Sequence, residues 1–166
     1  MKSISLFSSM LMLGSLAVSQ QALAACAIDK SPKDLSLDEL GSYYECDNAV
    51  AKAYPNWKAG ATGPAKPGFH SNRYLMTYVN DIGHSTYVAY ASSDVDMPIG
   101  SVIAKESFKI KSGGKLKAGP LFIMEKVGVD KAPEAQGWVY SAVKASGKPM
   151  SVKQSFCHSC HQAYAE

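Results

Sequence analysis

The sequence predicts an α+β domain, in which an antiparallel sheet has one helix before its strands and a short helix after them. Between Arg73 and Val143, stretches rich in β-branched and aromatic residues alternate with turns that contain glycine or proline. Helix-start patterns of the form S-x-x-E or S-x-x-Q lie outside this region, at Ser36 and Ser151. Consecutive strands joined by short turns favour antiparallel pairing, and the two outer patterns place helices at the ends.

Residues 1–24 have the pattern of a signal peptide. Lys2 is their only charged residue, an apolar run covers residues 4–18, and the Ala-Leu-Ala at 22–24 fits a cleavage site. We therefore expect export to the periplasm and a mature chain of residues 25–166, which is long enough for a single domain with its own core. In an alternative interpretation, the Leu-Ala-Ala-Cys that ends at Cys26 is a bacterial lipobox, and Cys26 carries a lipid anchor.

The first helix is predicted from Leu37 to about Tyr54, with Pro55 ending it. Cys46 lies midway along this helix, roughly 15 Å from its start at about 1.5 Å per residue. The segment before the helix can span that distance, so we expect a Cys26–Cys46 disulfide in an oxidising compartment. If Cys26 is lipidated instead, Cys46 remains a free buried thiol.

A loop is predicted over residues 55–69, because this stretch contains three prolines and three glycines. It ends at Phe69 and His70. Loops of this length within a small domain often cover a functional site, so each of these two side chains is a candidate for closing a pocket.

Five strands are predicted after the loop, at residues 73–80, 85–91, 100–111, 121–127 and 138–143, with a turn at 94–98 and a tight hairpin at Gly113-Gly114. The third strand alternates between an apolar face, formed by Val102, Ala104, Phe108 and Ile110, and a polar face, formed by Ser101, Lys105, Ser107, Lys109 and Lys111. Glu106 falls on the apolar face and therefore needs a partner there.

The most informative stretch is Cys157-His158-Ser159-Cys160-His161, which has the C-x-x-C-H spacing of c-type haem attachment. On one turn of a helix that opens at Ser151, Cys157 and Cys160 can each form a thioether to one vinyl group of the same macrocycle. His161 is then held under the iron as its proximal ligand. The motif predicts one covalently attached haem c per chain.

A zinc site and a redox dithiol are the alternative interpretations of the two motif cysteines. A structural zinc site needs a second ligand pair, and the other two cysteines, Cys26 and Cys46, do not have C-x-x-C spacing. A redox dithiol typically opens a helix in a βαβ unit, and no such unit is predicted before Cys157. Haem is therefore the preferred interpretation.

The charge balance indicates no polyanionic partner. The chain has 17 Lys and Arg residues against 14 Asp and Glu residues, and its formal charge is +3. Lys2 lies in the signal segment, and haem propionates would offset most of the remaining positive charge. Neither nucleic acid nor an anionic membrane surface is therefore an expected partner.

Four parts of the chain resemble the cytochrome P-460 family, which includes cytochrome c′-beta. They are Phe69-His70 with Tyr78-Val79-Asn80-Asp81, the strand Pro98-Ile99-Gly100-Ser101-Val102-Ile103-Ala104-Lys105-Glu106, residues 123–126 with 133–138, and Cys157–His161. The resemblance implies a predominantly antiparallel sheet, a small periplasmic homodimer, and a five-coordinate haem iron with an open distal side.

The same resemblance implies action on small nitrogen species. Some family members oxidise hydroxylamine with a haem that is cross-linked to a lysine, and Lys105 occupies that position by motif; a partner cytochrome would then accept the electrons. Members of the cytochrome c′-beta type bind nitric oxide in an apolar pocket. The chain has no Asp or Glu between Lys144 and Cys157, so it departs from any catalytic member that takes a pocket carboxylate from that segment.

The alternative function is electron transfer by a six-coordinate haem, which needs a strong second axial ligand. Met124 is the first candidate for a sulfur ligand, followed by Met76 and Met97. In the open-site interpretation, Phe69 and His70 instead cap the distal pocket, and Lys105 lies beside the haem.

Overall fold

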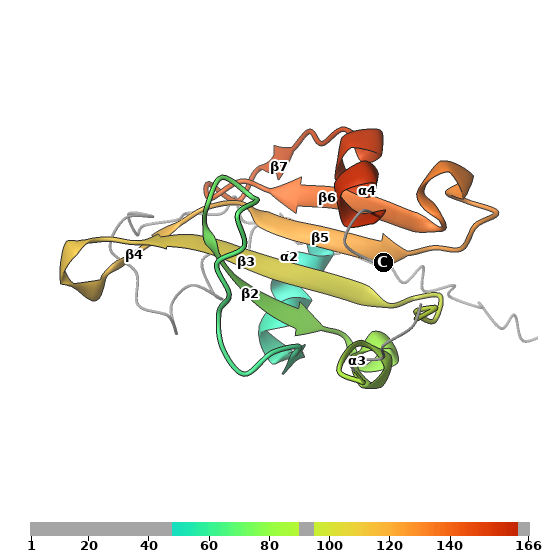
Figure 1. Ribbon diagram of the computed structural model, residues 1–166, viewed down its shortest axis with the longest axis horizontal. Helices are drawn as coiled ribbons and strands as arrows, with labels where there is room; N and C mark the ends of the chain where they lie inside the picture. Colours follow the sequence, from blue (N-terminus) through green and yellow to red (C-terminus); the bar gives the residue numbers. More distant parts are fainter. Residues whose placement is uncertain (1–47, 90–94, 163–166) are drawn as a thin grey trace, which may run out of the picture.

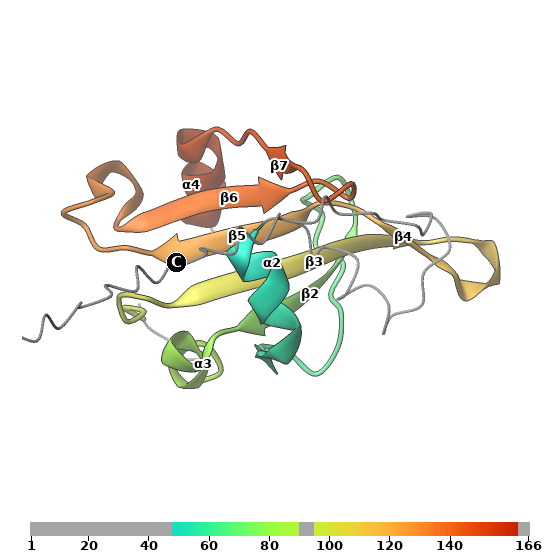
Figure 2. The same ribbon diagram turned by 180° about the vertical axis from the view of Figure 1, so that it is seen from behind.

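A computed structural model describes residues 48–89 and 95–162. The predicted signal peptide, Cys26, Cys46 and the helix-start pattern at Ser36 lie outside the described residues. Within them, a seven-stranded antiparallel sheet carries helices on both of its faces (Figures 1 and 2). The predicted α+β class with an antiparallel sheet is therefore confirmed. No helix in the described ranges is both long and apolar enough to span a bilayer.

The strands are β1 (Lys58–Ala59), β2 (Tyr74–Val79), β3 (Val102–Ile110), β4 (Leu116–Ala118), β5 (Leu121–Lys126), β6 (Trp138–Val143) and β7 (Pro149–Met150). They are ordered β1-β2-β3-β5-β6-β7, and β4 pairs with the far end of β3. Four of the five predicted strands are confirmed, at β2, β3, β5 and β6. The short strands β1, β4 and β7 were not predicted, because two or three residues give no alternating pattern.

Of the helix predicted from Leu37 to Tyr54, the structure describes only residues 48–54. Asn48 has an extended backbone, and its side chain accepts a hydrogen bond from the Ala51 amide at 3.0 Å, so Asn48 is the N-cap of the helix α2 (Ala49–Ala53). A 3-10 turn, η1 (Tyr54–Asn56), follows and contains Pro55. Asparagine is a strong N-cap residue, so this local preference sets a helix start inside the range over which apolar periodicity predicted one helix.

Helix α2 lies across one face of the sheet, as the rear view shows (Figure 2). The core between them comprises Ala51, Tyr54, Ala104, Phe108, Leu116, Ala118, Leu121, Ile123 and Val143. Glu106 points into this core with 2% of its surface exposed, and the Tyr54 hydroxyl donates a hydrogen bond to its Oε1 at 2.7 Å. Burial raises the pKa of Glu106 to about 7, although the hydrogen bonds from Tyr54 and Tyr78 act in the opposite direction.

The two faces of β3 differ less than the sequence predicts. On the expected polar face Ser107 is fully buried, and its hydroxyl donates to the Pro120 carbonyl. On the expected apolar face Ile110 is 52% exposed. The middle of β3 is covered on both sides by other parts of the chain, whereas its end pairs only with β4 in a projecting hairpin. Position along the strand therefore decides burial as much as alternation does.

The strand predicted at 85–91 is wrong, because residues 81–87 form helix α3 (Asp81–Tyr87). Asn80 caps this helix by accepting a hydrogen bond from the Gly83 amide at 3.2 Å, and it also ties the helix to β3 through the Val102 amide and the Gly100 carbonyl. A Cβ at Gly83 would lie 2.8 Å from the Ser101 side chain, so this glycine permits close packing and does not break a strand.

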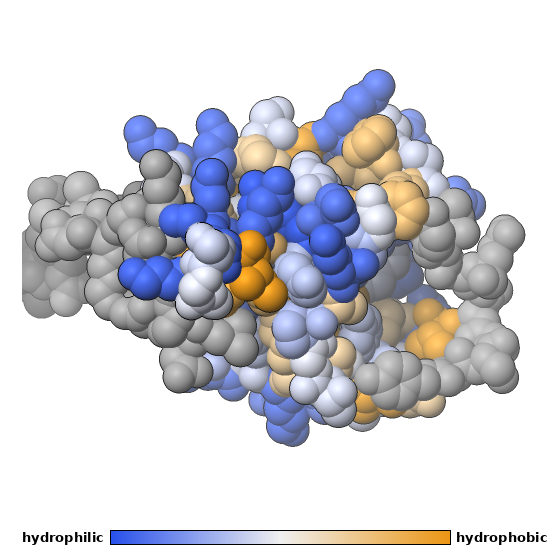
Figure 3. Space-filling view, turned by 60° about the vertical axis from the view of Figure 1, so that its left-hand side comes forward, coloured by the Kyte–Doolittle hydropathy of each residue, from blue (hydrophilic) through white to orange (hydrophobic). Residues whose placement is uncertain are grey.

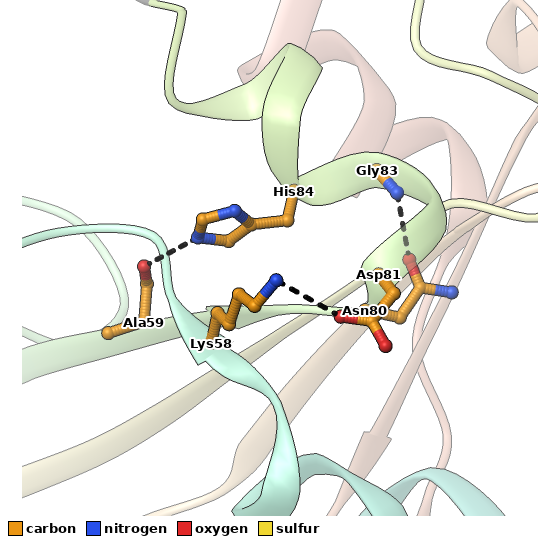
Figure 4. Close-up of polar contacts among 6 residues, drawn as sticks. All are labelled: Lys58, Ala59, Asn80, Asp81, Gly83 and His84. Carbon is orange, nitrogen blue, oxygen red and sulfur yellow. Dashed lines mark hydrogen bonds and ion pairs between the residues drawn. The ribbon is translucent and has the colours of Figure 1, made fainter.

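Two contacts hold α3 against the strand β1 (Figure 4). The His84 ring bonds the Ala59 carbonyl at 3.1 Å, and the Lys58 ammonium lies 3.6 Å from the Asp81 carboxylate. Because Lys58 and Asp81 are both largely exposed, this ion pair contributes little to stability. The contacts position the edge of the sheet, at a distance from the residues that carry the chemistry.

The β3–β4 hairpin projects from one end of the molecule (Figure 1). Its turn uses Gly113 at φ 79° and Gly114 at φ 77°, as the Gly-Gly pair predicts. The hairpin exposes Lys109, Lys111, Lys115 and Lys117. Figure 3 views the molecule toward this end, where hydrophilic side chains gather around a few apolar ones. This surface is solvated and lies outside the functional site described next.

Candidate functional site

The C-x-x-C-H motif lies on α4 (Gln154–Gln162), which crosses the face of the sheet opposite α2 (Figure 1). A helix here was predicted, but its capping box at Ser151 is wrong. The Gln154 side chain does not return to Ser151. Instead it accepts a hydrogen bond from the Tyr140 amide at 2.8 Å and donates one to the Tyr140 carbonyl at 2.6 Å. Gln154 thereby continues the pairing of β6 beyond the end of β7 and fixes the start of α4 on the sheet.

Replacement of Gln154 with alanine should loosen α4. The variant loses both bonds to Tyr140, each worth about 1 kcal/mol, and the helix should open more often because it has no fully buried side chain of its own. Hydrogen exchange of the α4 amides measures this opening. Gln162→Ala, at the exposed far end of the same helix, should leave the exchange rates near those of wild type; equal rates in both variants would contradict the role of Gln154.

A mainly apolar cavity of about 310 Å³ lies between α4, the strands β3, β5 and β6, and the end of the long loop. This volume is within the range of small-molecule sites. It is lined by Phe69, His70, Ser71, Lys105, Phe122, Ile123, Met124, Tyr140, Ser141, Phe156, Cys157, Cys160 and His161. Among these described residues there is no carboxylate.

One wall of the cavity is formed by the motif itself. Cys157, Cys160 and His161 are each half-buried and lie within about one turn of helix. Burial raises the pKa of the Cys157 thiol, and Cys160 raises it further. A redox dithiol requires the opposite shift, toward an easily formed thiolate. This environment therefore disfavours the dithiol interpretation.

His161 is held as a neutral imidazole. The pKa of His161 is lowered to about 4, mainly by burial and further by the nearby Lys105, His70 and His158. Its ring lies 5.5 Å from that of Tyr140, whose hydroxyl is 3.3 Å from Nδ1 of His158. A neutral imidazole is the form that binds a metal.

Lys105 and Phe122 form the floor of the cavity and belong to a row of side chains across three strands. Lys105 of β3 is opposite Phe122 of β5, which is opposite Ala142 of β6, so all three point to the same face. Burial lowers the pKa of Lys105. The strand alternation indicated that Lys105 lies on the opposite face from Ala104. The alternation could not indicate that α4, which carries the C-x-x-C-H motif, lies over this face.

The end of the long loop forms the remaining wall. His70, Ser71 and Asn72 have φ of 53°, 60° and 56°, and the Asn72 amide bonds the Phe69 carbonyl at 3.1 Å. Three consecutive non-glycine residues in the left-handed region are costly, and such strain tends to occur at functional sites. The turn directs His70 to within 4.4 Å of Phe122 and 6.2 Å of His161, measured between ring centroids.

A second cavity of about 170 Å³ adjoins the first. Both are lined by Phe69, His70, Lys105, Cys160 and His161, and the second extends to Pro67 and Leu75. The described part of the chain thus brings together all six of the predicted site residues that it contains. Cys26 and Cys46, predicted as a disulfide, lie outside it.

Of the three candidate sulfur ligands, Met124 lines the larger of these two cavities, and Met76 and Met97 line neither. Met76 pairs with Glu106 and so lies on the opposite face, and Met97 is buried beside Gly83. Sequence reasoning missed Phe122, Tyr140 and Phe156 as cavity residues. The strands and the helix that carry these residues were predicted correctly. Which side chains face the cavity, however, depends on the register between the strands and on the position of α4 over the sheet.

A family model described as cytochrome P460 matches residues 51–166. The chain belongs to the cytochrome P460 family. No curated protein matches the chain. As a member of a cytochrome family the protein binds haem, and its cavities fit such a group: two thiols and an imidazole from one helical turn form one wall, and aromatic and aliphatic side chains form the others. Among the described residues no cluster of His, Cys, Asp and Glu could hold a separate metal ion.

Proposed function

We propose that this cytochrome P460 family member is an exported c-type haem protein that binds nitric oxide on the side of the haem opposite His161. The observation that carries the proposal is the composition of the cavity. The attachment motif lines one side of it, apolar and aromatic side chains line most of the rest, and no carboxylate is among the described lining residues. Such a site favours a small neutral ligand over a charged one.

Cys157 and Cys160 would attach the haem, each by addition of its thiol across one vinyl group. The S–H bond breaks, the sulfur forms a C–S bond, and the proton goes to the other vinyl carbon, so no oxidant is needed. The raised pKa of Cys157 is compatible with this step, because its thiol keeps the proton that it must deliver. Both thiols must be reduced at that moment, and both are free in the structure.

His161 would be the proximal ligand, and its low pKa keeps its nitrogen available over the physiological range. Gln154 and Tyr140 would hold the helix that carries it. When bound, the haem would supply an iron able to bind a diatomic ligand. Phe69 and Phe122 would exclude water from that side, although Phe69 is 44% exposed and so forms only part of the wall.

Titration of the reduced protein with nitric oxide tests this function. A stoichiometric change in the visible spectrum is the expected result. Absence of any response at nitric oxide concentrations well above that of the protein would overturn the proposal, provided that mass spectrometry shows haem to be attached.

Hydroxylamine oxidation is the second candidate function, because Lys105 lines both cavities beside the motif. Burial lowers the pKa of its amine, which makes it a better nucleophile toward a porphyrin edge. If Lys105 is cross-linked, Lys105→Ala should abolish both the red-shifted Soret band and the oxidation. Lys109→Ala, on the same face of the same strand but exposed, is the matched control and should retain both. If Lys105→Ala changes neither property, the cross-link is excluded, and nitric oxide binding remains the proposed function.

A further inference from the structure

The β3–β4 hairpin carries four lysines that face one another in pairs. Lys109 of β3 is directly opposite Lys117 of β4, and the Lys111 amide bonds the Lys115 carbonyl at 2.8 Å across the turn. All four are exposed, and residues 109–117 contain no acidic residue. Like charges directly opposite one another on a sheet are destabilising. The hairpin therefore keeps an arrangement that lowers its own stability.

These four lysines form the lysine surface, which continues the face of the sheet that carries the haem cavity. Side chains at every second position of a strand share a face, so Lys109 is on the same face as Lys105, which lines both cavities. Phe108 and Leu116 point the other way, into the core beneath α2. At about 3.3 Å per residue, Lys109 is roughly 13 Å along β3 from Lys105. A protein docked on the lysine surface would lie beside the cavity.

Charge is separated along the molecule. The exposed Lys144 and Lys148 face one another across the β6–β7 turn, at the same end as the hairpin (Figure 1). Apart from the buried Glu106, the acidic residues of the described ranges lie toward the other end, near the start of β3: Asp81, Asp96, Glu125, Asp130 and Glu134. Ion pairs form there, from Lys58 to Asp81 and from Lys126 to Asp96. The small net charge of the chain does not reveal this separation.

A basic surface beside a haem suits an acidic partner that carries electrons. The nitric oxide binding proposed above uses ferrous iron, and an iron that has become ferric must receive one electron from a donor to return to that state. Charges of one sign near a site steer an oppositely charged partner toward it and raise the rate of encounter. Lysines that repel one another outside the core fit a surface kept for association and not for folding.

We propose that the lysine surface, with Lys144 and Lys148 beside it, docks an acidic one-electron carrier protein that reduces the haem. The proposal rests on the haem attachment and the nitric oxide binding proposed above, and it adds the partner that maintains the ferrous state. One electron leaves the carrier, the ferric iron takes it up and becomes ferrous, and no proton or other reactant is required. The encounter should be fast at low salt and slow at high salt.

The test measures how fast flavodoxin hydroquinone, an acidic one-electron donor, reduces the ferric haem-loaded protein. Lys109→Gln with Lys117→Gln is compared with Lys52→Gln with Lys131→Gln, which removes the same charge from exposed positions outside the surface. At an ionic strength of about 10 mM the first variant should react about tenfold more slowly than wild type, and the control should react nearly as fast as wild type. At about 0.5 M the difference should disappear.

A small uncharged hydroquinone provides the second control. It should reduce wild type and both variants at the same rate, because chemistry with small molecules does not depend on the lysine surface. Equal rates with flavodoxin in wild type and both variants would overturn the proposal. If vesicles of phosphatidylglycerol bind the protein through these lysines while flavodoxin reduces all forms equally, the surface binds an anionic membrane and the protein partner is wrong.

Two further measurements need no electron transfer. In a nuclear magnetic resonance titration of wild type, oxidised flavodoxin should shift the amide signals of residues 109–117. The variant with Lys109→Gln and Lys117→Gln should be at least as stable as wild type, because it loses the repulsion between these side chains. A less stable variant would indicate that an acidic segment of this chain occupies the surface, and would overturn the external partner. Absence of haem, or of any nitric oxide response, would instead be a failure of the proposed function, and the titration would still decide whether the surface docks an acidic protein.

Discussion

Simultaneous replacement of Cys157 and Cys160 by serine should abolish covalent haem attachment. A serine hydroxyl has nearly the size of a thiol but does not add to the vinyl groups, so the protein should be exported without haem or release it on denaturation. The measurement is the intact mass of the denatured protein produced with a working haem-attachment system. The expected effect is complete loss of the haem mass, because no other described cysteine is available.

Ser159→Ala provides the matched control for this pair of substitutions. Ser159 lies between the two cysteines on the same turn and is exposed, and its hydroxyl donates a hydrogen bond to the Phe156 carbonyl at 3.0 Å. The control should retain full haem attachment. If the double serine variant still carries the haem mass, another residue forms the covalent bond and the attachment proposal fails.

The second large effect is a pH dependence of stability that originates at Glu106. Its carboxyl is 2% exposed, and burial raises its pKa from the ordinary 4.5 to about 7. Between these two values the folded state holds a proton that the unfolded state has lost, so the contribution to stability is present at low pH and is lost as the pH rises through about 7. The loss should reach about 3 kcal/mol above that pH.

Glu106→Gln isolates this effect, because glutamine can still accept the hydrogen bond from Tyr54 but does not titrate. Between about pH 4 and pH 8 the free energy of unfolding of wild type should fall by about 3 kcal/mol relative to that of the variant. Glu134→Gln, which removes an exposed carboxylate, should follow wild type. Parallel pH profiles for wild type and Glu106→Gln would show that the carboxyl is not held protonated by burial.

The sequence predicted those features that depend on local patterns. The strand at 138–143 and the helix that carries Cys157 were found because alternation, turn residues and motif spacing are local. The requirement for a partner at Glu106 was also foreseeable, because a carboxylate on an apolar face must be satisfied. That the partner is Tyr54, 52 positions earlier, depends on how α2 crosses the sheet.

The remaining features depend on tertiary contacts. The residues after Asn80 have a strand-like sequence pattern but form a helix. Asn80 caps this helix and also bonds the start of β3, a contact that the local sequence does not reveal. The polar face of β3 becomes the floor of the cavity because α4 lies over it, so Lys105 changes from a candidate surface lysine to a cavity residue. The approach of His70 to His161 depends on three consecutive left-handed residues, and non-glycine residues adopt this conformation too rarely for the sequence to predict three in a row.

The most direct test of a haem in this cavity is the mass of the purified wild-type protein after denaturation in acid. We expect a single species whose mass equals that of residues 25–166 plus one haem, with the haem located by fragmentation to the peptide that contains Cys157 and Cys160. A species with the mass of the peptide alone, from cells that attach haem to other c-type cytochromes, would contradict it.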